Sequence, residues 1–260
     1  MKGEQRHIGL ARALSKLGYC SRSRAADFIR QGRVRLNGAL RRDPETPVHL
    51  QKDCIAVDGI LVEPGRKIYL MMNKPRGLVT TAADEKGRDT IYSVLRSEDN
   101  LPWLAPVGRL DKGSEGLLLL TNDSEWAARV TAPDTHLEKT YHVQVARVAD
   151  KAVIEAMQRG VPANGENLSA RQCRVIRSGE QNSWLEIVLD EGRNRQIRRM
   201  LASLDIEVLR LLRVAIGPIQ LGKLEKGSYR ALTLEEKLEL DHAMKLNSRV
   251  RHPSSKSPLL

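Results

Sequence analysis

The sequence predicts an α+β protein in two parts, a small N-terminal module of helices and strands and a larger body of the same mixed class. Three observations support this class. The chain has 260 residues, enough for one or two domains with a full hydrophobic core. Within the first sixty positions, apolar residues recur first at helical and then at strand spacing. A turn at Pro64-Gly65 then precedes a long stretch in which strand-like and helix-like segments are mixed.

The N-terminal module begins with two short predicted helices. Leucines at positions 10, 14 and 17 share one helical face, and Gly18 ends this first helix. Ser21 is suited to cap a second helix, because its hydroxyl can accept a hydrogen bond from the first helical turn. We expect this second helix to stop at Gly32.

A predicted β-hairpin and a cluster of arginines complete the module. Residues 33–36 alternate as a strand does and run into Asn37-Gly38, a pair typical of tight hairpin turns. Five arginines lie within fourteen residues, which favours a phosphate-contacting face over a merely solvated one. They are Arg22, Arg24, Arg30, Arg33 and Arg35.

The larger body is expected to combine strands with helices. Strands are predicted at residues 67–72, 117–121, 141–145 and 184–189. Helices are predicted from Glu125 after a Ser124 cap, over 194–204, and from a capping box at Thr233 to about Leu246. The domains are therefore expected at 8–62 and 66–246, followed by a basic, disordered tail at 247–260.

The basic charge of the chain is concentrated at its two ends. The formal net charge is +11, and residues 1–60 carry 12 basic against 6 acidic side chains. Residues 246–260 add 3 basic and no acidic side chains, whereas residues 61–245 are close to balance with 28 against 26. This pattern favours a nearly neutral body with an attached clamp for a polyanion such as nucleic acid. A basic surface that serves only solubility is the alternative.

Several classes of protein are excluded or disfavoured. The densest apolar run, Leu117–Leu120, is far shorter than a membrane span, and the first twenty residues lack the apolar core of a secretory signal. Cys20, Cys54 and Cys173 form neither a zinc pattern nor a disulfide framework. We therefore expect a cytoplasmic protein that does not contact membranes.

The motifs of common cofactor and metal enzymes are also missing. The sequence contains no GxxxxGK, no GxGxxG and no HExxH, and its histidines have no metal-ligand spacing. His142, on a predicted strand, is expected to be structural. We therefore expect neither a nucleotide cofactor nor a metal.

The segment GRLDKGSEGLLLLTND, residues 108–123, carries the strongest catalytic signal. Its loop holds Arg109 and Asp111 between glycines and leads directly into a buried apolar strand. A carboxylate at the end of a rigid strand is held in place, as catalysis requires. The alternative from spacing alone is that Asp111 only caps a turn.

This segment closely resembles the signature of the RsuA-type pseudouridine synthases, which isomerise uridine in ribosomal RNA. Three further segments agree with that family in order and spacing: NKPRGLVTT at 73–81, LEKTYHVQV at 137–145 and EGRNRQIRRM at 191–200. Residues 18–38 resemble an S-four-like RNA-binding domain, so the resemblance spans about residues 8–245. Small departures are Ser114, where threonine is expected, and Glu115, at a variable position.

The resemblance implies a fold and a reaction. The fold is a largely antiparallel mixed sheet, flanked by helices around a central cleft with Asp111 at its floor. The reaction converts one uridine of ribosomal RNA to pseudouridine without a cofactor. Asp111 acts at the ribose, either by attacking C1′ or by removing the 2′ proton, and Arg198 pairs with it. Tyr141 stacks on the target base and helps to remove the C5 proton.

Other basic residues are expected to contact RNA. Arg109 holds the target nucleotide out of its helix, and Lys139 lies on the same strand face as Tyr141. The basic motif supplies Arg193, Arg195 and Arg199 toward phosphate. The partner implied is ribosomal RNA, with the large subunit slightly favoured, or an assembly intermediate, and the enzyme is expected to be a monomer.

Two alternatives remain open at this point. A non-catalytic RNA-binding or ribosome-assembly factor could share the fold, but it has no need of Asp111, Tyr141 and Arg198 together. An enzyme that hydrolyses another glycosidic bond is disfavoured, because no convincing second acid accompanies Asp111.

Overall fold

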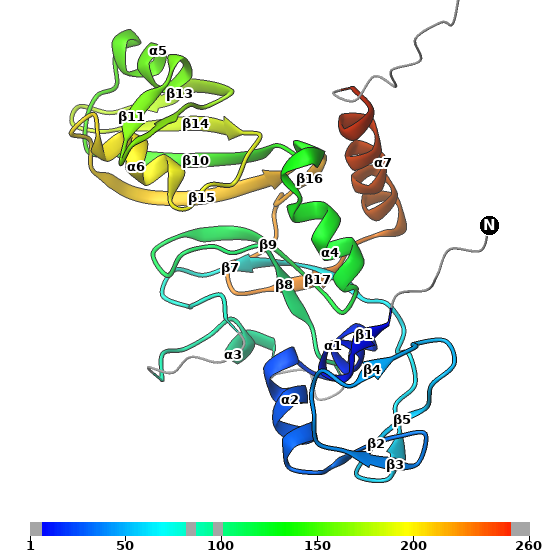
Figure 1. Ribbon diagram of the computed structural model, residues 1–260. Helices are drawn as coiled ribbons and strands as arrows, with labels where there is room; N and C mark the ends of the chain where they lie inside the picture. The colour runs from blue at the N-terminus through cyan, green and yellow to red at the C-terminus, as the bar shows by residue number, and fades with distance from the viewer. Residues whose placement is uncertain (1–6, 82–86, 96–100, 251–260) are drawn as a thin grey trace, which may run out of the picture.

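The computed structural model describes residues 7–81, 87–95 and 101–250 of the chain (Figure 1). It confirms the mixed α+β class with a largely antiparallel sheet. A nine-stranded sheet forms the larger body, and a four-stranded sheet forms the N-terminal module. The predicted division near residue 62 falls in a stretch, 62–68, that contains no helix or strand. Along the described part of the chain, no helix is both long enough and apolar enough to span a membrane.

The N-terminal module packs two helices against small sheets. Helix α1 is Leu10–Lys16 and helix α2 is Arg22–Arg30, with Ser21 Oγ accepting a hydrogen bond from the Arg24 amide at 3.2 Å. Asn37 and Gly38 both have positive φ and form the tight turn that joins two strands of the sheet. The strands are β1 Ile8–Gly9, β2 Val34–Leu36, β3 Ala39–Arg41, β4 Pro47–Val48, β5 Ile55–Val57 and β6 Ile60–Leu61. The predicted helices and hairpin are therefore confirmed.

The large sheet has the strand order β13-β14-β10-β15-β9-β7-β17, with β8 paired to β9 and β16 to β15. Its strands are β7 Tyr69–Lys74, β8 Ala105–Val107, β9 Glu115–Thr121, β10 Lys139–Val145, β13 Gln172–Ser178, β14 Ser183–Leu189, β15 Val208–Ile216, β16 Ile219–Gln220 and β17 Tyr229–Ala231. A separate hairpin joins β11 Val161–Ala163 to β12 Glu166–Leu168. The helices of the body are α3 Tyr92–Leu95, α4 Ser124–Thr131, α5 Lys151–Arg159, α6 Gln196–Ala202 and α7 Leu234–Val250, with a 3₁₀ turn at Pro133–Thr135.

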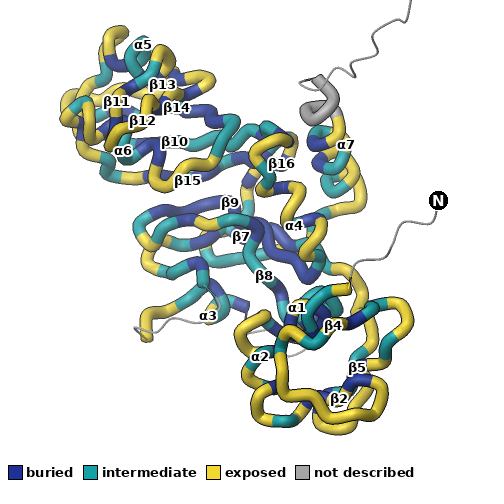
Figure 2. The backbone as a smooth tube through the Cα atoms, in the orientation of Figure 1, coloured by how far each residue is buried: buried dark blue, intermediate teal, exposed yellow. Residues whose placement is uncertain are grey.

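Strand β9 lies near the middle of this sheet and is buried along its whole length (Figure 2). Leu117 and Leu119 pack into one apolar cluster with Trp126 of α4, whereas Leu118 and Leu120 pack into another on the opposite side. Burial on both faces explains the unbroken apolar run, because neither set of alternate side chains meets water. The strand is therefore a rigid base for the loop that precedes it.

The pairing of β9 with β15 is the one parallel contact among the described strands. It is short, joining only Glu115 and Gly116 to Leu212 and Arg213. The sheet is split at this junction, with one apolar core around β10, β14, α5 and α6 and the others around β7 and β9. The junction is where the two halves of the body can leave a cavity.

Several predicted boundaries need correction. Helix α4 is capped by Asp123, whose Oδ1 accepts hydrogen bonds from the amides of Glu125 and Trp126 at 3.2 Å, so Ser124 is its first helical residue. The first strand of the body begins two residues later than predicted, and α6 begins at Gln196. The reciprocal capping box of Thr233 and Glu236 is confirmed.

The last helix, α7, runs to Val250 rather than stopping near Leu246. Nothing in the sequence between these residues opposes a helix, and the first strong helix breaker is Pro253. The helix therefore includes the first residues of the predicted tail. Residues 251–260 of that tail lie outside the described residues.

Candidate active site

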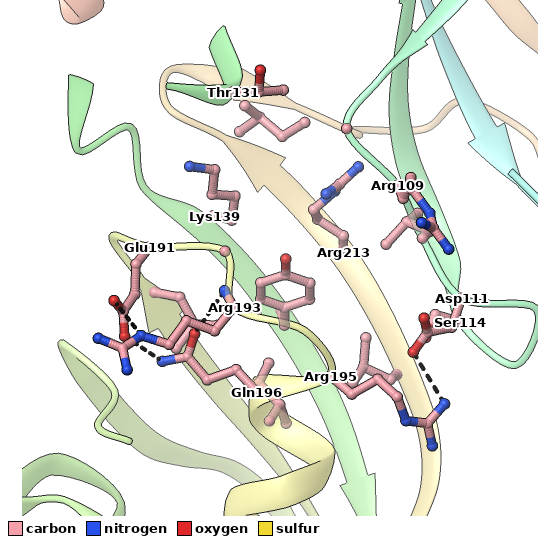
Figure 3. Close-up of a pocket in the computed structure, with 18 of the residues that line it drawn as sticks. Arg109, Asp111, Ser114, Thr131, Lys139, Glu191, Arg193, Arg195, Gln196 and Arg213 are labelled. Atoms are coloured by element: carbon pink, nitrogen blue, oxygen red, sulfur yellow. Dashed lines mark hydrogen bonds and ion pairs between the residues drawn. The ribbon is translucent and has the colours of Figure 1, made fainter. Parts of the chain in front are cut away.

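A cavity of about 460 Å³ lies at the junction of β9, β10 and β15 (Figure 3). Its walls come from the loop before β9, from strands β10 and β15, and from the segment leading into α6. Segments far apart in the sequence therefore meet here. Of the predicted site residues, the cavity is lined by Asp111, Tyr141, Arg198, Arg109, Lys139, Arg193 and Arg195.

The loop that carries Asp111 is held from beneath by a buried lysine. Lys74, at the end of β7, is fully buried, and its Nζ donates hydrogen bonds to the carbonyl oxygens of Pro75, Asp111 and Ser114 at 3.1, 3.2 and 2.9 Å. Burial lowers the pKa of Lys74 to about 8, although the nearby carboxylates of Asp111 and Glu115 oppose this shift. The lysine therefore fixes the backbone of this loop at Asp111 and at Ser114.

Sequence analysis did not single out Lys74, although it lies in the quoted segment NKPRGLVTT. Lysine is rarely buried, so its position at the end of a strand gave no reason to expect this contact. The predicted strand ended at residue 72, whereas β7 continues to Lys74, so no sequence signal pointed to this contact.

The side chain of Asp111 is 35% exposed and forms an ion pair with Arg195, whose Nη1 lies 3.4 Å from Asp111 Oδ2. The predicted pairing with Arg198 is not the one the structure forms. Arg198 Nη2 donates instead to the carbonyl oxygen of Gly113 at 3.1 Å, in the same loop. Arg195 reaches the carboxylate because it precedes α6 in the left-handed conformation, with φ of 48°.

Arg198 nevertheless interacts electrostatically with Asp111. Burial lowers the pKa of Arg198 from its ordinary value, and the neighbouring positive charge of Arg195 lowers it further, while Asp111 opposes both. The two arginines and the aspartate are therefore one electrostatic group at one end of the cavity. Arg195 satisfies the carboxylate, and Arg198 secures the loop.

Tyr141 and Lys139 line the cavity from β10. Tyr141 lies opposite Arg213 of β15 in the antiparallel register, and a bulge separates Thr140 from Tyr141. The tyrosine is partly buried and packs against apolar clusters on both sides of the sheet junction. Its ring is therefore held in position within the cavity wall.

Arg213 is a cavity residue that sequence analysis missed. It is only 5% exposed, and its Nε donates to the carbonyl oxygen of Leu117 at 2.7 Å. Arg213 and Lys139 come from neighbouring strands, and Figure 3 shows Lys139 between Thr131 and Glu191 and the Arg213 guanidinium extending toward Arg109. No strand was predicted at 208–216, so no pattern placed this arginine inside.

Arg193 and Arg199, two further members of the basic motif, also have protein partners. Arg193 donates to Glu191 at 2.9 Å and to Glu166 at 3.1 Å, at the edge of the cavity. Arg199 lies outside the cavity, where it pairs with Glu166 and donates to the carbonyl oxygen of Ala163 at 2.7 Å. Arg199 therefore joins α6 to the β11–β12 hairpin, which does not match its predicted role in facing RNA phosphate.

The five predicted arginines of the N-terminal module are exposed, but they are not equivalent. Arg33 forms an ion pair with Asp58 and stacks over the Phe28 ring at 4.2 Å. Arg35 donates to the Gly38 carbonyl oxygen at 2.9 Å. Of the remaining three, Arg24 lies 5.4 Å from the Phe28 ring centroid and Arg30 lies 3.5 Å from Asp27, whereas the Arg22 guanidinium has no such contact with a described residue.

Comparison with known proteins agrees with these motifs. The profile of the family described as RNA pseudouridylate synthase matches residues 68–203, and that of the S4 domain matches residues 8–54. The chain is 37% identical over 240 residues to an uncharacterized RNA pseudouridine synthase of Aquifex aeolicus, covering 92% of this chain and 96% of that protein. It is 32% identical over 230 residues to ribosomal large subunit pseudouridine synthase B of Bacillus subtilis, covering 87% and 93%. A crystal structure of a pseudouridylate synthase, 32% identical, aligns with a TM-score of 0.61 over 90% of this chain and 99% of that one.

Proposed function

The chain belongs to the RNA pseudouridylate synthase family and carries an S4 domain, and from this premise we propose that it converts a single uridine of ribosomal RNA to pseudouridine, with Asp111 as the catalytic carboxylate. The name of the Bacillus relative favours the large ribosomal subunit as the source of the target. We further propose that the enzyme acts as a monomer in the cytoplasm, on ribosomal RNA or an assembly intermediate.

The reaction is an isomerisation with a closed atom balance. The bond between C1′ and N1 breaks, the uracil turns, and a bond forms between C1′ and C5. The proton on C5 leaves, and N1 ends protonated, so the product has the composition of the substrate. The protein must therefore hold the ribose and the detached base together while protons move.

The position of Asp111 is the observation that carries this proposal. Lys74 holds the loop, Arg195 balances one carboxylate oxygen, and the group faces the cavity from the side opposite β10. An ionised carboxylate is needed either to attack C1′ or to take the 2′ proton, and a cationic partner favours that form. Tyr141 lines the same cavity and offers an aromatic surface for the uracil.

The size of the cavity supports a substrate of one nucleotide. A volume of about 460 Å³ lies within the range of small-molecule sites. Enzymes that act on a base in folded nucleic acid take that base out of its stack, at a cost of a few kcal/mol. Arg109, exposed at the rim, is placed to hold the extruded nucleotide.

The first test is a map of pseudouridines across both ribosomal RNAs in cells with the normal gene, a deletion, and Asp111→Asn. We expect one uridine to lose its modification in both altered strains. Asp205→Asn, an exposed aspartate with positive φ that asparagine tolerates, is the matched control and should keep the modification.

Two outcomes contradict the proposal in different ways. A site that stays modified with Asp111→Asn but not in the deletion refutes the role of this carboxylate. If no site changes in either strain, a binding or assembly factor becomes the better description of the chain.

A further inference from the structure

Two cations in the cavity form no ion pair with an acidic side chain in the part of the chain that the structure describes. Only 5% of the surface of Arg213 is exposed. Its Nη2 is a buried hydrogen-bond donor that no described residue accepts from. Lys139, on the neighbouring strand β10, makes no side-chain hydrogen bond or ion pair with any described residue. Both side chains line the cavity, and each is close enough to the other for the charge of Arg213 to lower the pKa of Lys139.

Without a bound anion, the proximity of these two positive charges is electrostatically unfavourable. Burial lowers the pKa of Lys139 to about 8, and the positive charge of Arg213 lowers it further, while Asp190 opposes. Asp190 is shared with His136, whose Nδ1 lies 3.9 Å from Asp190 Oδ2. Two neighbouring positive charges, one buried and one partly buried, that form no ion pair of their own favour the entry of an anion.

The other charged groups of the cavity leave this pair available. Asp111 is paired with Arg195, and Arg193 is paired with Glu191. Arg213 and Lys139 are therefore the cations of the cavity wall that the reaction scheme does not use.

The strand register places this pair beside the base-binding tyrosine. Arg213 lies directly across from Tyr141, and Lys139 lies two residues before it on the same strand. A phosphodiester is joined directly to the ribose on which Asp111 acts, so an anion site in this cavity meets the phosphate of the target nucleotide or of its 3′ neighbour.

We propose that Arg213 and Lys139 form a phosphodiester subsite, which binds a backbone phosphate flanking the target uridine and so positions the ribose against Asp111. The inference deepens the proposed function and rests on it for the identity of the RNA. A planar guanidinium and a compact ammonium together suit a phosphate group, because both donate charge-assisted hydrogen bonds.

The main experiment pairs protein variants with RNA fragments that contain the mapped uridine. Each fragment carries a neutral methylphosphonate at one position, either directly 5′ or 3′ of the target or several nucleotides away. With Arg213 and Lys139 both present, one flanking methylphosphonate should weaken binding roughly tenfold or more, whereas the distant one should not. Equilibrium binding is read with Asp111→Asn, so that the RNA is not converted, and product formation is read with Asp111 intact.

The variants decide whether Arg213 and Lys139 are the partners of that phosphate. With Arg213→Gln or Lys139→Gln, normal RNA should bind about tenfold more weakly, and the methylphosphonate should cost less than a further twofold. Arg213→Lys should recover part of the loss. Lys139→Gln is informative even if Arg213→Gln fails to fold, because the Lys139 ammonium holds no described residue in place. Arg159→Gln, exposed on α5, is the control.

A second measurement needs no mapped site. Uridine 5′- and 3′-monophosphates and uridine are titrated into the intact protein while the NMR signal of the Lys139 side chain is followed. At least one monophosphate should bind at least tenfold more tightly than uridine, and Arg213→Gln should remove that difference.

The inference is overturned by a methylphosphonate effect below twofold at both flanks, by an equal effect in the normal protein and the variants, or by monophosphates that bind no better than uridine. Equal losses for uridine and its monophosphates in Arg213→Gln would assign the arginine to the base, which also overturns it. Failure of the proposed function looks different, because phosphate coupling would persist in binding while no pseudouridine forms.

Discussion

Two arginines one turn apart, Arg195 and Arg198, serve the Asp111 loop in different ways. Arg195 forms the ion pair with the carboxylate, and Arg198 holds the Gly113 carbonyl oxygen. Because one arginine contacts the charge and the other the backbone, their removal should have different consequences.

We expect Arg195→Gln to lower the single-turnover rate at saturating RNA roughly tenfold, with little change in melting temperature. Arg198→Gln should lower the rate and the melting temperature together, because a partly buried hydrogen bond to the loop is lost. Rapid-quench kinetics and thermal unfolding measure both effects, with exposed Arg177→Gln as the control. A normal rate in Arg195→Gln would return the role of carboxylate partner to Arg198.

The charge of Lys139 makes stability depend on pH. Burial lowers the pKa of Lys139 from 10.5 to about 8 in the folded protein. Between these values the unfolded chain binds more protons, so the contribution of this lysine to the free energy of unfolding rises with pH across that window. Well below pH 8 both states are protonated, and the partly buried charge destabilises the folded protein in full.

Lys139→Met should therefore be more stable than the normal protein at pH 7, by on the order of 1–3 kcal/mol. The difference should shrink toward pH 10.5, because Lys139 is then neutral in the folded protein and already half deprotonated in the unfolded chain. Denaturant unfolding at pH 7 and pH 10 measures this, and the shift that burial causes at Lys74 cancels because both proteins keep it. Exposed Lys151→Met is the control, and a stability gap that does not change with pH contradicts the prediction.

At the scale of the element, the contact of β9 with β15 depends on a glycine. Gly116 has φ of 103°, and a Cβ placed there would lie 2.3 Å from the carbonyl oxygen of Arg213 and 2.9 Å from its amide. A side chain at this position would push β15 away from β9, at the junction that forms the cavity.

Gly116→Ala is expected to destabilise the body by about 2–4 kcal/mol, through positive-φ strain together with a backbone clash. Gly165→Ala measures the positive-φ strain alone, since Gly165 has φ of 79° and no atom within 4 Å of its Cβ position. This variant should lower the free energy of unfolding by about 1 kcal/mol. Denaturant unfolding compares the two variants. Equal losses would show that the close approach of the strands is unimportant.

At the scale of the whole molecule, the N-terminal module is fixed to the body at a point away from the cavity. Lys16 of α1 pairs with Glu125 of α4 at 2.6 Å, and Gly18 packs against Asn122. Figure 1 shows the module beside the β7–β9 part of the sheet, with β10, β14 and α6 farther off. This arrangement suits a module that adds affinity for RNA without touching the reacting base.

Replacing Arg22, Arg24 and Arg30 together by glutamine should weaken binding of an rRNA fragment. The slope of log K against the logarithm of the salt concentration should become smaller in magnitude by about 2–3. The single-turnover rate at saturating RNA should stay within about twofold of normal, because the cavity is unchanged. Binding at several salt concentrations and rapid-quench kinetics measure both quantities. A variant with normal affinity and a slowed chemical step would contradict this division of labour. Exposed Arg171→Gln, Arg174→Gln and Arg177→Gln provide a control with the same change in charge.

Local patterns in the sequence were sufficient to predict many of the helices, strands and turns of this molecule. The helices of the module, the Asn37-Gly38 turn, the capping box at Thr233 and the buried β9 strand follow from interactions within a few residues, which spacing and residue type reveal. The quoted motifs also named the residues that meet in the cavity, including Asp111 and Tyr141.

The partners of the long cationic side chains were decided only by the tertiary structure. Lys74 contacts the carbonyl of Ser114 40 residues away, Arg195 contacts Asp111 across 84 residues, and Arg213 contacts Leu117 across 96. A lysine or arginine looks the same in sequence whether it faces water, a carbonyl or a carboxylate. Burial and charge environment arise when β7, β9, β10 and β15 come together, so the sequence by itself determined which chemical groups are present, and the packing of distant strands determined which of them act on one another.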